Sequence, residues 1–467
     1  MGYTTRLNER GAIATRYTSH QGIDHDALDA FGYDWERVGR PDIPPVYPAK
    51  IYLPRTTDDI VAAVREAKQL GQTLTVRSRG HSSNRLVLTP GPLLSTSLLN
   101  RILAVDERQM TATVQAGVMS ADVDDLLDAR GYGLPVIGDH NDITVGGFAS
   151  VGGIGPASFR HGLFIDNVVG LEYVTFDGEV VSCSRSLNPD HFFRVLCGTG
   201  RFGIIATITC RIIRIEKRRT VLRNHRRVFT RVESFVEASA PIVASPDGLA
   251  MLRAAWNDAG TVRIGHVSCY RDTRQSGWKS LRARTGYGFY HRVGRRAGLL
   301  SPRRETIARA LGTVGVLLPP RYGTIKDVEF FSDRMLSSTA GERSRWFILL
   351  VPSQSYRALF RAVYELGLEF RARYGCFHAV CMYVKALRSA YLSPDPNQYY
   401  CEMILFTTMT ARALQEPELD DLVSRLDDLC LAHGALRYMH SRTVADPERR
   451  DRLDPNIVFA RRAAAAS

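Results

Sequence analysis

The sequence lacks the residue patterns of several protein classes. Its eight cysteines include no C-x-x-C pair and do not cluster with histidines, which argues against a zinc site and against a disulfide scaffold. No apolar run approaches the roughly 18 to 20 residues of a membrane-spanning helix, and the first residues lack the apolar core of a signal peptide. These absences predict a cytoplasmic protein in which most cysteines are small buried side chains.

Two nucleotide-related patterns are also missing. No G-x-G-x-x-G opens a helix after a strand with an acid about twenty residues further on, so a Rossmann unit is not expected. The net charge is +13, but no helix-turn-helix, RNP-like or finger pattern accompanies it, so nucleic acid is not an expected partner. Residues 271–309 hold eleven Lys or Arg against two acids. This segment is either a solvated insertion or a patch with weak affinity for an anionic surface.

The remaining composition is that of an ordinary globular protein. Hydrophobic residues make up 45% and charged residues 23% of 467 residues, enough for two or three domains. The clearest local signals are a capped helix at 60–67, a hairpin across Asp177-Gly178, and a helix at 122–130 capped by Ser120. Further elements are expected as helices at 24–30, 188–196, 232–240, 356–374 and 416–432, and as strands at 74–77, 93–97, 110–115, 249–255, 261–270, 346–351, 377–384 and 399–408. The second half of this order predicts an antiparallel sheet with helices on one face.

Glycine is concentrated between residues 146 and 155, where five of ten residues are glycine. That density is too high for a stable helix or strand interior. Such a segment lets the backbone approach a ligand and exposes its N–H groups, which suits a flat, anionic nucleotide cofactor. A purely structural cluster of turns is the alternative.

A second polar turn, Ser78 to Asn84, follows the strand at 74–77. A strand that ends in a glycine-containing turn presents consecutive backbone donors, which suit a pyrophosphate. On residue type alone, His81 in this turn is a histidine bonded to nearby backbone.

These segments together resemble a known family, the covalent-flavin oxidases with a PCMH-type (vanillyl-alcohol-oxidase-like) FAD domain, and within it the cytokinin dehydrogenases. The similar segments are Arg79-Gly80-His81-Ser82, Thr144-Val145-Gly146-Gly147, Phe159-Arg160-His161-Gly162, Asn167-Val168, Asp177-Gly178-Glu179, Leu187-Asn188-Pro189 and Gly200-Arg201-Phe202-Gly203-Ile204-Ile205. They cover about the first half of the chain.

The resemblance implies an α+β fold in three parts. Residues 1–217 would form a two-part FAD-binding domain with its core at about 43–217. Residues 218–430 would form an α+β substrate cap, with an antiparallel sheet flanked by helices. Residues 431–467 would return to the FAD domain. The chain differs from cytokinin dehydrogenases at Arg85-Leu86 and at Tyr383-Val384-Lys385-Ala386, so the substrate is left open.

The resemblance also implies a cofactor site. His81 matches the histidine that carries FAD through a covalent bond to the 8α carbon. The other residues expected at the cofactor are Arg77, Ser78, Arg79, Gly80, Ser82, Asp139, Thr144, Gly146, Gly147, Ser150, Ile154, Ile205 and Tyr438.

Three residues are candidates for catalysis. Asp139 matches the active-site aspartate of cytokinin dehydrogenases, and desolvation beside the flavin is expected to raise its pKa; Asp142 competes for this role, and either residue could instead cap the turn. Tyr438 resembles a tyrosine near the flavin ring. Glu402 lies in an otherwise apolar strand, so it is either buried and paired or on the solvent face.

The expected function is an FAD-dependent oxidase or dehydrogenase. It would remove a hydride and a proton from a C–N or C–O centre of a small molecule and pass the electrons to dioxygen or a quinone-like acceptor. The alternatives are an alcohol or sugar oxidase, a C=C flavin reductase, and a non-catalytic flavin-binding scaffold.

Overall fold

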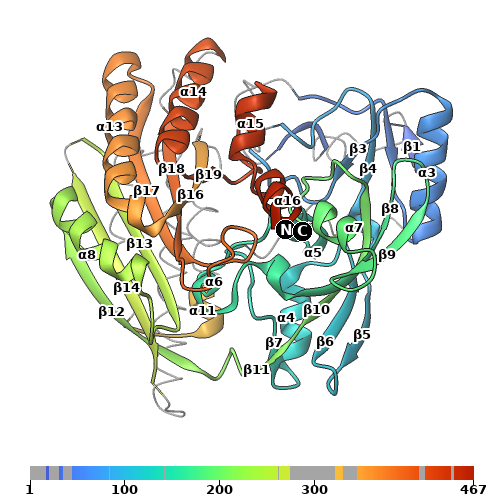
Figure 1. The fold of residues 1–467 in the computed structure, drawn as a ribbon, viewed down its shortest axis with the longest axis horizontal. Coiled ribbons are helices and arrows are strands. Elements are labelled where there is room, and N and C mark those ends of the chain that lie inside the picture. Colours follow the sequence, from blue (N-terminus) through green and yellow to red (C-terminus); the bar gives the residue numbers. More distant parts are fainter. Residues whose placement is uncertain are drawn as a thin grey trace, which may run out of the picture.

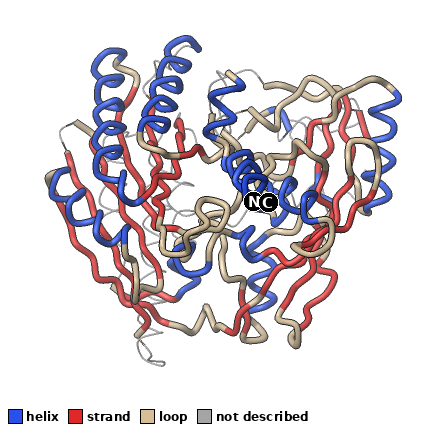
Figure 2. Tube along the Cα trace, in the orientation of Figure 1, coloured by secondary structure: helices blue, strands red, loops and turns tan. Residues whose placement is uncertain are grey.

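The chain forms a mixed α+β structure with sheets on two sides, longer helices beside the sheets and short helices between the two sides (Figures 1 and 2). This computed structural model describes residues 17–19, 31–34, 45–83, 85–140, 143–260, 262–273, 321–329, 344–409, 416–442 and 446–466. The helix expected at 24–30, Asn84, Asp142 and most of the basic segment 271–309 lie outside these residues. Among the described helices, none is long and apolar enough to cross a membrane.

The first part of the chain holds a small sheet and the helix beside it. The strand order is β1 (Tyr17–Ser19), β2 (Lys50–Tyr52), β4 (Pro92–Ser95) and β3 (Thr75–Arg77), and β4 is parallel to both β2 and β3. Helix α3 (Thr57–Gln69) begins with the expected cap, because Thr56 and Asp59 form a reciprocal capping box. Its buried side chains, among them Ile60 and Val64, pack with Tyr52 and Leu94.

A five-stranded antiparallel sheet follows. Its order is β5 (Ile102–Asp106), β6 (Thr111–Gln115), β10 (Ile204–Arg211), β8 (Val168–Val174) and β9 (Val180–Ser184). The β8–β9 hairpin confirms the turn at Asp177-Gly178. The remaining elements of this half are η4 (Thr96–Leu98), α4 (Ser120–Asp128), β7 (Tyr132–Gly133), α6 (Ser158–His161), η5 (Phe164–Asn167), α7 (Pro189–Val195) and β11 (Ile213–Arg214).

The expected cap of one helix is wrong, and a second helix has no side-chain cap at its start. Helix α4 begins at Ser120 itself, after Met119, and the Ser120 hydroxyl caps nothing. Asn188 precedes α7 in a left-handed conformation, and its side chain donates to the Ser182 carbonyl oxygen at 2.9 Å instead of capping the helix. The Ser120 hydroxyl has no hydrogen-bond partner within the described residues, whereas Asn188 bonds outside its helix, and the residue type alone reveals neither.

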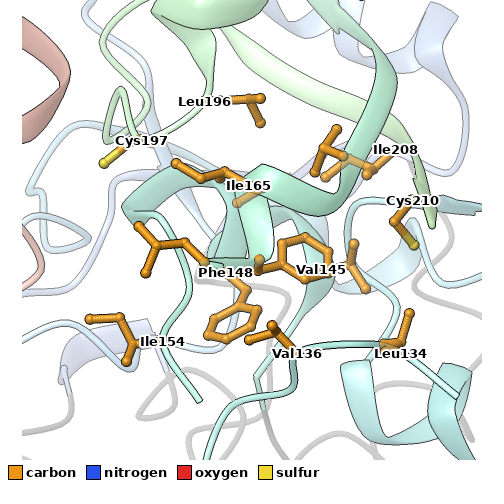
Figure 3. Packing of buried hydrophobic residues seen from close by; sticks show 14 of the residues in the cluster. Leu134, Val136, Val145, Phe148, Ile154, Ile165, Leu196, Cys197, Ile208 and Cys210 are labelled. Atoms are coloured by element: carbon orange, nitrogen blue, oxygen red, sulfur yellow. The ribbon is translucent and has the colours of Figure 1, made fainter. Parts of the chain in front are cut away.

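The first part of the glycine-rich stretch forms a helix, so the expectation that glycine excludes one is wrong for Gly146 and Gly147, whereas Gly152, Gly153 and Gly155 lie beyond the helix. Helix α5 (Val145–Val151) begins after Thr144, whose hydroxyl accepts from the Gly147 N–H at 3.2 Å. Val145 and Phe148 pack into the main core of this half (Figure 3). A Cβ at Gly146 would lie 2.6 Å from the Ala116 Cβ. Close packing against β6 therefore requires the glycine and compensates for its low helix propensity.

The second half of the chain builds one large antiparallel sheet, as expected. Its order is β15 (Tyr322–Thr324), β12 (Val221–Phe229), β14 (Arg263–Asp272), β13 (Met251–Asp258), β17 (Phe377–Leu387), β18 (Tyr400–Met409), β16 (Ser344–Pro352) and β19 (Leu436–Arg437). Helices α8 (Val232–Ala244), α13 (Tyr356–Tyr374) and α14 (Glu416–Ala432) pack on one face and share an apolar core with it (Figures 1 and 2). The other face turns toward the first half, next to the short helix α11 (Ile325–Glu329).

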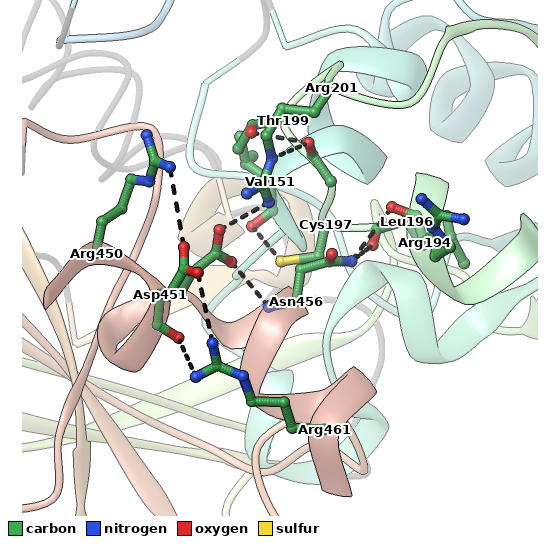
Figure 4. A network of polar contacts seen from close by, with 12 residues as sticks. Val151, Arg194, Leu196, Cys197, Thr199, Arg201, Arg450, Asp451, Asn456 and Arg461 are labelled. Atoms are coloured by element: carbon green, nitrogen blue, oxygen red, sulfur yellow. Dashed lines mark hydrogen bonds and ion pairs between the residues drawn. The ribbon is translucent and has the colours of Figure 1, made fainter. Parts of the chain in front are cut away.

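The last segment returns to the first half through α15 (Pro447–Leu453) and α16 (Pro455–Ala466). Asn456 donates to the carbonyl oxygens of Phe193, Arg194 and Leu196 at 3.0, 3.3 and 2.8 Å, and buried Asp454 forms an ion pair with Arg201 at 2.7 Å (Figure 4). These contacts fix the loop that leads into β10. The boundaries at residues 217 and 430 stay predictions.

All eight cysteines are free thiols. Cys197 is buried, and its thiol lies 3.5 Å from the Val151 carbonyl oxygen, while burial raises its pKa. A buried, protonated thiol is unreactive, so Cys197 packs rather than reacts. No group of His, Cys, Asp or Glu in the described part of the chain has the geometry of a metal site.

Candidate functional site

One cavity lies between the open face of the large sheet and the first half of the chain. The space between its walls, open solvent at the mouth included, is about 2070 Å³. It brings together Ser78, Arg79, Gly80, His81, Ser82, Asp139, Thr144, Gly146, Gly147, Ser150, Ile154, Ile205, Glu402 and Tyr438. Every described residue that was selected from the sequence lines this cavity except Arg77; Asp142 lies outside the described residues. Its guanidinium is buried and donates to the Tyr33 carbonyl oxygen at 2.8 Å, and burial lowers its pKa to about 10.

The turn after β3 is tied to α5 by hydroxyl groups. Thr144 donates to the Ser78 hydroxyl oxygen at 2.9 Å, and Ser78 is 2.6 Å from the Thr96 hydroxyl. At the end of the turn, the Ser83 N–H donates to the His440 carbonyl oxygen at 3.0 Å. Segments from three distant parts of the sequence therefore hold this turn in place.

The residues of the turn fit a dinucleotide. Gly80 has a φ of +74°, and a Cβ there would lie 2.2 Å from Nη2 of Arg77. Ser82 Oγ and His440 Nδ1 are buried at the cavity wall and have no hydrogen-bond partner within the described residues. Because buried polar atoms are almost always satisfied, these two atoms point to a polar ligand in the cavity.

His81 is neutral in this environment. Its ring centroid lies 5.6 Å from that of His140. Burial, then His140 and Arg79, lower the pKa of His81 well below its ordinary value. A neutral imidazole has a free nitrogen lone pair, which is the form that attacks an electrophilic carbon.

Asp139 is held by two cations. Its carboxylate oxygens lie 2.8 Å from Arg253 and 2.6 Å from Lys385. Burial raises the pKa of Asp139, but Arg253 and Lys385 outweigh burial and hold it below its ordinary value. The expected raised pKa is therefore wrong, because both cations come from strands of the large sheet rather than from the neighbouring sequence.

Of the carboxyl groups of Asp139 and Glu402 in this cavity, that of Glu402 has the raised pKa. Its exposed fraction is 4%, and Oε2 lies 2.7 Å from Lys385. Burial raises its pKa more than Lys385 lowers it, and Asp139 adds to the increase. The alternative of a solvent-facing Glu402 is excluded. Lys385 thus lies between two carboxylates of the same cavity.

Tyr438 closes the cavity from the C-terminal side. Its hydroxyl accepts from the Gly153 N–H at 3.1 Å, and burial raises its pKa well above the ordinary value. The ring is 4.8 Å from that of His440. Tyr438 therefore stays protonated and serves as a fixed wall with a hydroxyl beside the glycine-rich segment.

Three residues of the site were missed by the sequence analysis: Arg253, His266 and Lys385. The signal that selected Glu402, a charged residue inside an apolar strand, also marks Arg253 on β13 and Lys385 on β17. His266 on β14 carries no such signal. It is buried at the cavity wall, and burial, Arg226 and Arg253 lower its pKa to about 4.

A second buried ion-pair network supports Arg253 from behind. Its Nη2 donates to the carbonyl oxygens of Val328 and Glu329, each at 2.8 Å. The Glu329 side chain accepts from Lys217 at 2.8 Å, and Lys217 is 3.0 Å from Asp124 on α4. The guanidinium that binds Asp139 is thus braced between α11 and the first half of the chain.

Comparison with known proteins identifies the first of these halves. Residues 48–184 match the family described as FAD binding domain. The chain is 31% identical over 166 residues to L-gulonolactone oxidase of Mus musculus, 36% over 166 residues to cytokinin dehydrogenase 2 of Arabidopsis thaliana, and 32% over 170 residues to D-arabinono-1,4-lactone oxidase of Eremothecium gossypii.

Each of these similarities covers a limited part of both proteins. The matched residues are 36%, 35% and 36% of this chain, and 38%, 33% and 32% of the respective relatives. The chain therefore spans about a third of the length of the relatives it matches. The shared part holds the turn at 78–83 and α5, whereas Arg253, Lys385 and Glu402 lie beyond the matched FAD binding domain.

Proposed function

We propose, from the premise that residues 48–184 belong to the FAD binding domain family, that the chain is an FAD-linked oxidoreductase of the lactone oxidase and cytokinin dehydrogenase type. It would take a hydride and a proton from a C–O or C–N centre of a small molecule. The carrying observation is that one cavity holds both His81 of the polar turn and the carboxylates Asp139 and Glu402.

FAD, when bound, supplies the acceptor for the hydride. The turn at 78–83 and the N-terminus of α5 would hold its diphosphate through backbone N–H groups and the Ser78 and Thr144 hydroxyls. His81 would carry the covalent bond to the 8α carbon. Its neutral state supports this role, since a protonated imidazole has no free lone pair for bond formation.

The two carboxylates, Asp139 and Glu402, have different roles in the proposed reaction. Glu402 has the raised pKa that proton abstraction near neutral pH requires. Asp139 stays ionised and fixes Arg253 and Lys385 at the cavity wall. We assign the substrate proton to Glu402 and the positioning of the two cations to Asp139. This reverses the emphasis that the sequence placed on Asp139.

The same residues favour a hydroxylated substrate over an apolar amine. Two cations and two carboxylates at one wall offer donors and acceptors that a polyol, sugar or lactone can use. An isoprenoid amine would have few groups to bond with these donors and acceptors. This observation supports the alcohol or sugar oxidase alternative. The relatives also imply an electron acceptor, for which we propose dioxygen or a quinone.

Anaerobic mixing with candidate substrates tests the function. Polyols, aldonolactones, amines and isoprenoid amines are added to the FAD-loaded protein, and loss of the flavin absorbance is followed. We expect reduction by at least one hydroxylated compound. The Glu402→Gln variant is the control and should keep its flavin spectrum but react slowly. A loaded protein that no compound reduces would support the flavin-binding scaffold instead.

A further inference from the structure

Asp124 is a fully buried carboxylate on α4 that lies outside the residues lining the cavity. Its Oδ1 accepts from the Leu134 N–H at 2.9 Å and lies 3.0 Å from Nζ of Lys217. Its Oδ2 accepts from Lys326 at 3.0 Å, which places α11 beside α4 (Figure 1). One carboxylate thus contacts three segments that are far apart in the sequence.

The contact with Leu134 fixes one end of the segment that carries Asp139. Leu134, Val136 and Ile137 are buried with almost no exposure. The Ile137 carbonyl oxygen packs so closely that a Cβ on Gly155 would lie 2.2 Å from it. Because closely packed interiors transmit displacements, the position of Leu134 affects that of Asp139 at the cavity wall.

Lys217 and Lys326 fix the position of α11 relative to α4. Nζ of Lys217 lies 2.8 Å from the Glu329 carboxylate on α11, and the Lys326 N–H donates to the Lys217 carbonyl oxygen at 3.3 Å. The carbonyl oxygens of Val328 and Glu329 accept from Arg253, each at 2.8 Å. A displacement of α11 would therefore remove two of the acceptors that hold the guanidinium at the cavity wall.

Net stability does not explain these buried charges. The cost of moving two charges out of water offsets their attraction, so an apolar replacement of a buried ion pair is often neutral or even stabilising. Lys217 lies between the carboxylates of Asp124 and Glu329 and holds both of them in place. The effect of this arrangement is to fix positions across the two halves of the chain.

We propose that Asp124 is a positioning residue for the Arg253–Asp139 ion pair at the cavity wall. It would act on Arg253 through α11 and on Asp139 through Leu134, so that one carboxylate sets both partners of the pair. Loss of the Asp124 charge would let the Arg253 guanidinium move away from the wall. This role rests on the proposed function, because it affects catalysis only if the cavity is the site of the reaction.

The position of Arg253 affects the pKa of two other groups at the cavity wall. Burial, Arg226 and Arg253 lower the pKa of His266 from 6.5 to about 4. Burial raises the pKa of Glu402, and Lys385 and Arg253 lower it. If the Arg253 guanidinium moves away, the pKa of His266 and that of Glu402 should both rise. His266 has no part in the proposed reaction, so its titration tests the position of Arg253 without a substrate.

NMR titration of the full FAD-loaded chain tests the proposal. The signal of His266 is assigned by its loss in His266→Gln. In Asp124→Asn, the pKa of His266 should rise toward its ordinary value of 6.5. Flavin reduction in Asp124→Asn should be slower by up to roughly 10²-fold, as for a small misplacement of a reacting group, and its rise with pH should occur at higher pH. Destabilisation of the fold alone would change neither titration.

Asp258→Asn is the matched control. Asp258 is also fully buried and lies on β13 with Arg253, but on the opposite face of the sheet, where it accepts from Tyr364 and Arg371. This variant should unfold at lower urea concentration and keep the wild-type pKa of His266. An equal rise of that pKa in both variants, no rise in Asp124→Asn, or a rise without slower flavin reduction would overturn the proposal.

A second variant applies if Asp124→Asn does not fold. Asp124→Asn combined with Lys217→Met removes an anion and a cation together, and Lys326 keeps its ion pair with Asp125. The pKa of His266 should rise in this variant too, and an unchanged value would overturn the proposal. A raised pKa of His266 in proteins whose flavin no compound reduces would support the positioning of the ion pair and overturn the oxidoreductase function.

Discussion

The guanidinium of Arg253 on β13 donates to the carboxylate of Asp139 at 2.8 Å and joins the two halves of the cavity. The same nitrogen donates to two carbonyl oxygens at the end of α11. These contacts fix the position of the Arg253 guanidinium, and the guanidinium in turn fixes the Asp139 carboxylate at the cavity wall. Four predictions follow from this network and from the cavity around it.

Loss of Glu402 should remove a proton acceptor. Because its pKa is raised, flavin reduction in the wild type should speed up as pH rises above about 4.5, the ordinary value for Glu. Glu402→Gln should slow reduction by roughly 10² to 10⁴-fold, the usual contribution of a general base, and abolish this pH limb. Stopped-flow absorbance measures both. Asp139→Asn is the comparison, and a larger loss there, with the pH limb retained in Glu402→Gln, would return the base role to Asp139.

Replacement of His81 should abolish the covalent attachment of FAD. In the wild type, the yellow colour is expected to stay with the acid-precipitated polypeptide, and in His81→Ala it should pass into the supernatant. His266→Ala is a matched control, because His266 also lines the cavity and is buried and neutral. Colour that washes off the wild type, or stays with His81→Ala, contradicts the tether.

Gly146→Ala should destabilise the protein and weaken its hold on FAD. The added Cβ would lie 2.6 Å from the Ala116 Cβ and 2.8 Å from the Ala116 carbonyl oxygen. Overpacking of this kind costs about 1 to 3 kcal/mol, measured by urea unfolding. Ser150→Ala on the same helix removes only a hydrogen bond to the Gly146 carbonyl oxygen at 2.8 Å and should cost about 1 kcal/mol. An unchanged Gly146→Ala protein would show that α5 can move away from β6.

Glu329 should make the protein less stable as pH rises through its titration, whereas the buried histidines, whose pKa values are lowered, act in the opposite direction. Burial, against Lys217, raises the pKa of Glu329 from 4.5 to about 7. Between these values Glu329 of the folded protein keeps a proton that the unfolded chain has lost, so its contribution to the free energy of unfolding decreases with pH across this window. The pKa of Asp124 is lowered from its ordinary value of 3.8, so this residue affects the pH dependence of stability only below about pH 3.8.

The matched variant for this window is Glu329→Gln, which has no carboxyl group to titrate. Urea unfolding at several pH values between 4.5 and 7 should show that the free energy of unfolding of the wild type, relative to that of the variant, decreases as pH rises. A slope that is the same in both proteins would assign the pH dependence to another group. The test needs no substrate and no bound cofactor.

The sequence predicted the elements of the large sheet and its helices well. Helices 356–374 and 416–432 begin and end at the predicted residues, because a long apolar period and a glycine such as Gly375 in a left-handed conformation define them locally. The hairpin at Asp177-Gly178 was equally clear. Local signals sufficed wherever the element depends on its own residues.

The predictions from the sequence were wrong where the structure depends on residues that are far apart in the chain. The helix at Val145–Val151 depends on contact between Gly146 and Ala116. The pKa of Asp139 depends on Arg253, which lies 114 positions further along the chain. The pattern of a single sequence does not show how strands so far apart in the chain pair. It therefore cannot show which charged side chains, such as Asp139 and Arg253, form an ion pair. The cavity residues near the FAD motifs were found because their spacing is local.

The hold of Asn456 on the carbonyl oxygens of Phe193, Arg194 and Leu196 has a consequence for biosynthesis. A ribosome releases residues 193–196 long before it makes residue 456, and Tyr438 and His440 of the cavity wall also come late. The nascent FAD binding domain cannot complete its wall before these residues have left the ribosome. Capture of the dinucleotide should therefore follow the synthesis of these late residues.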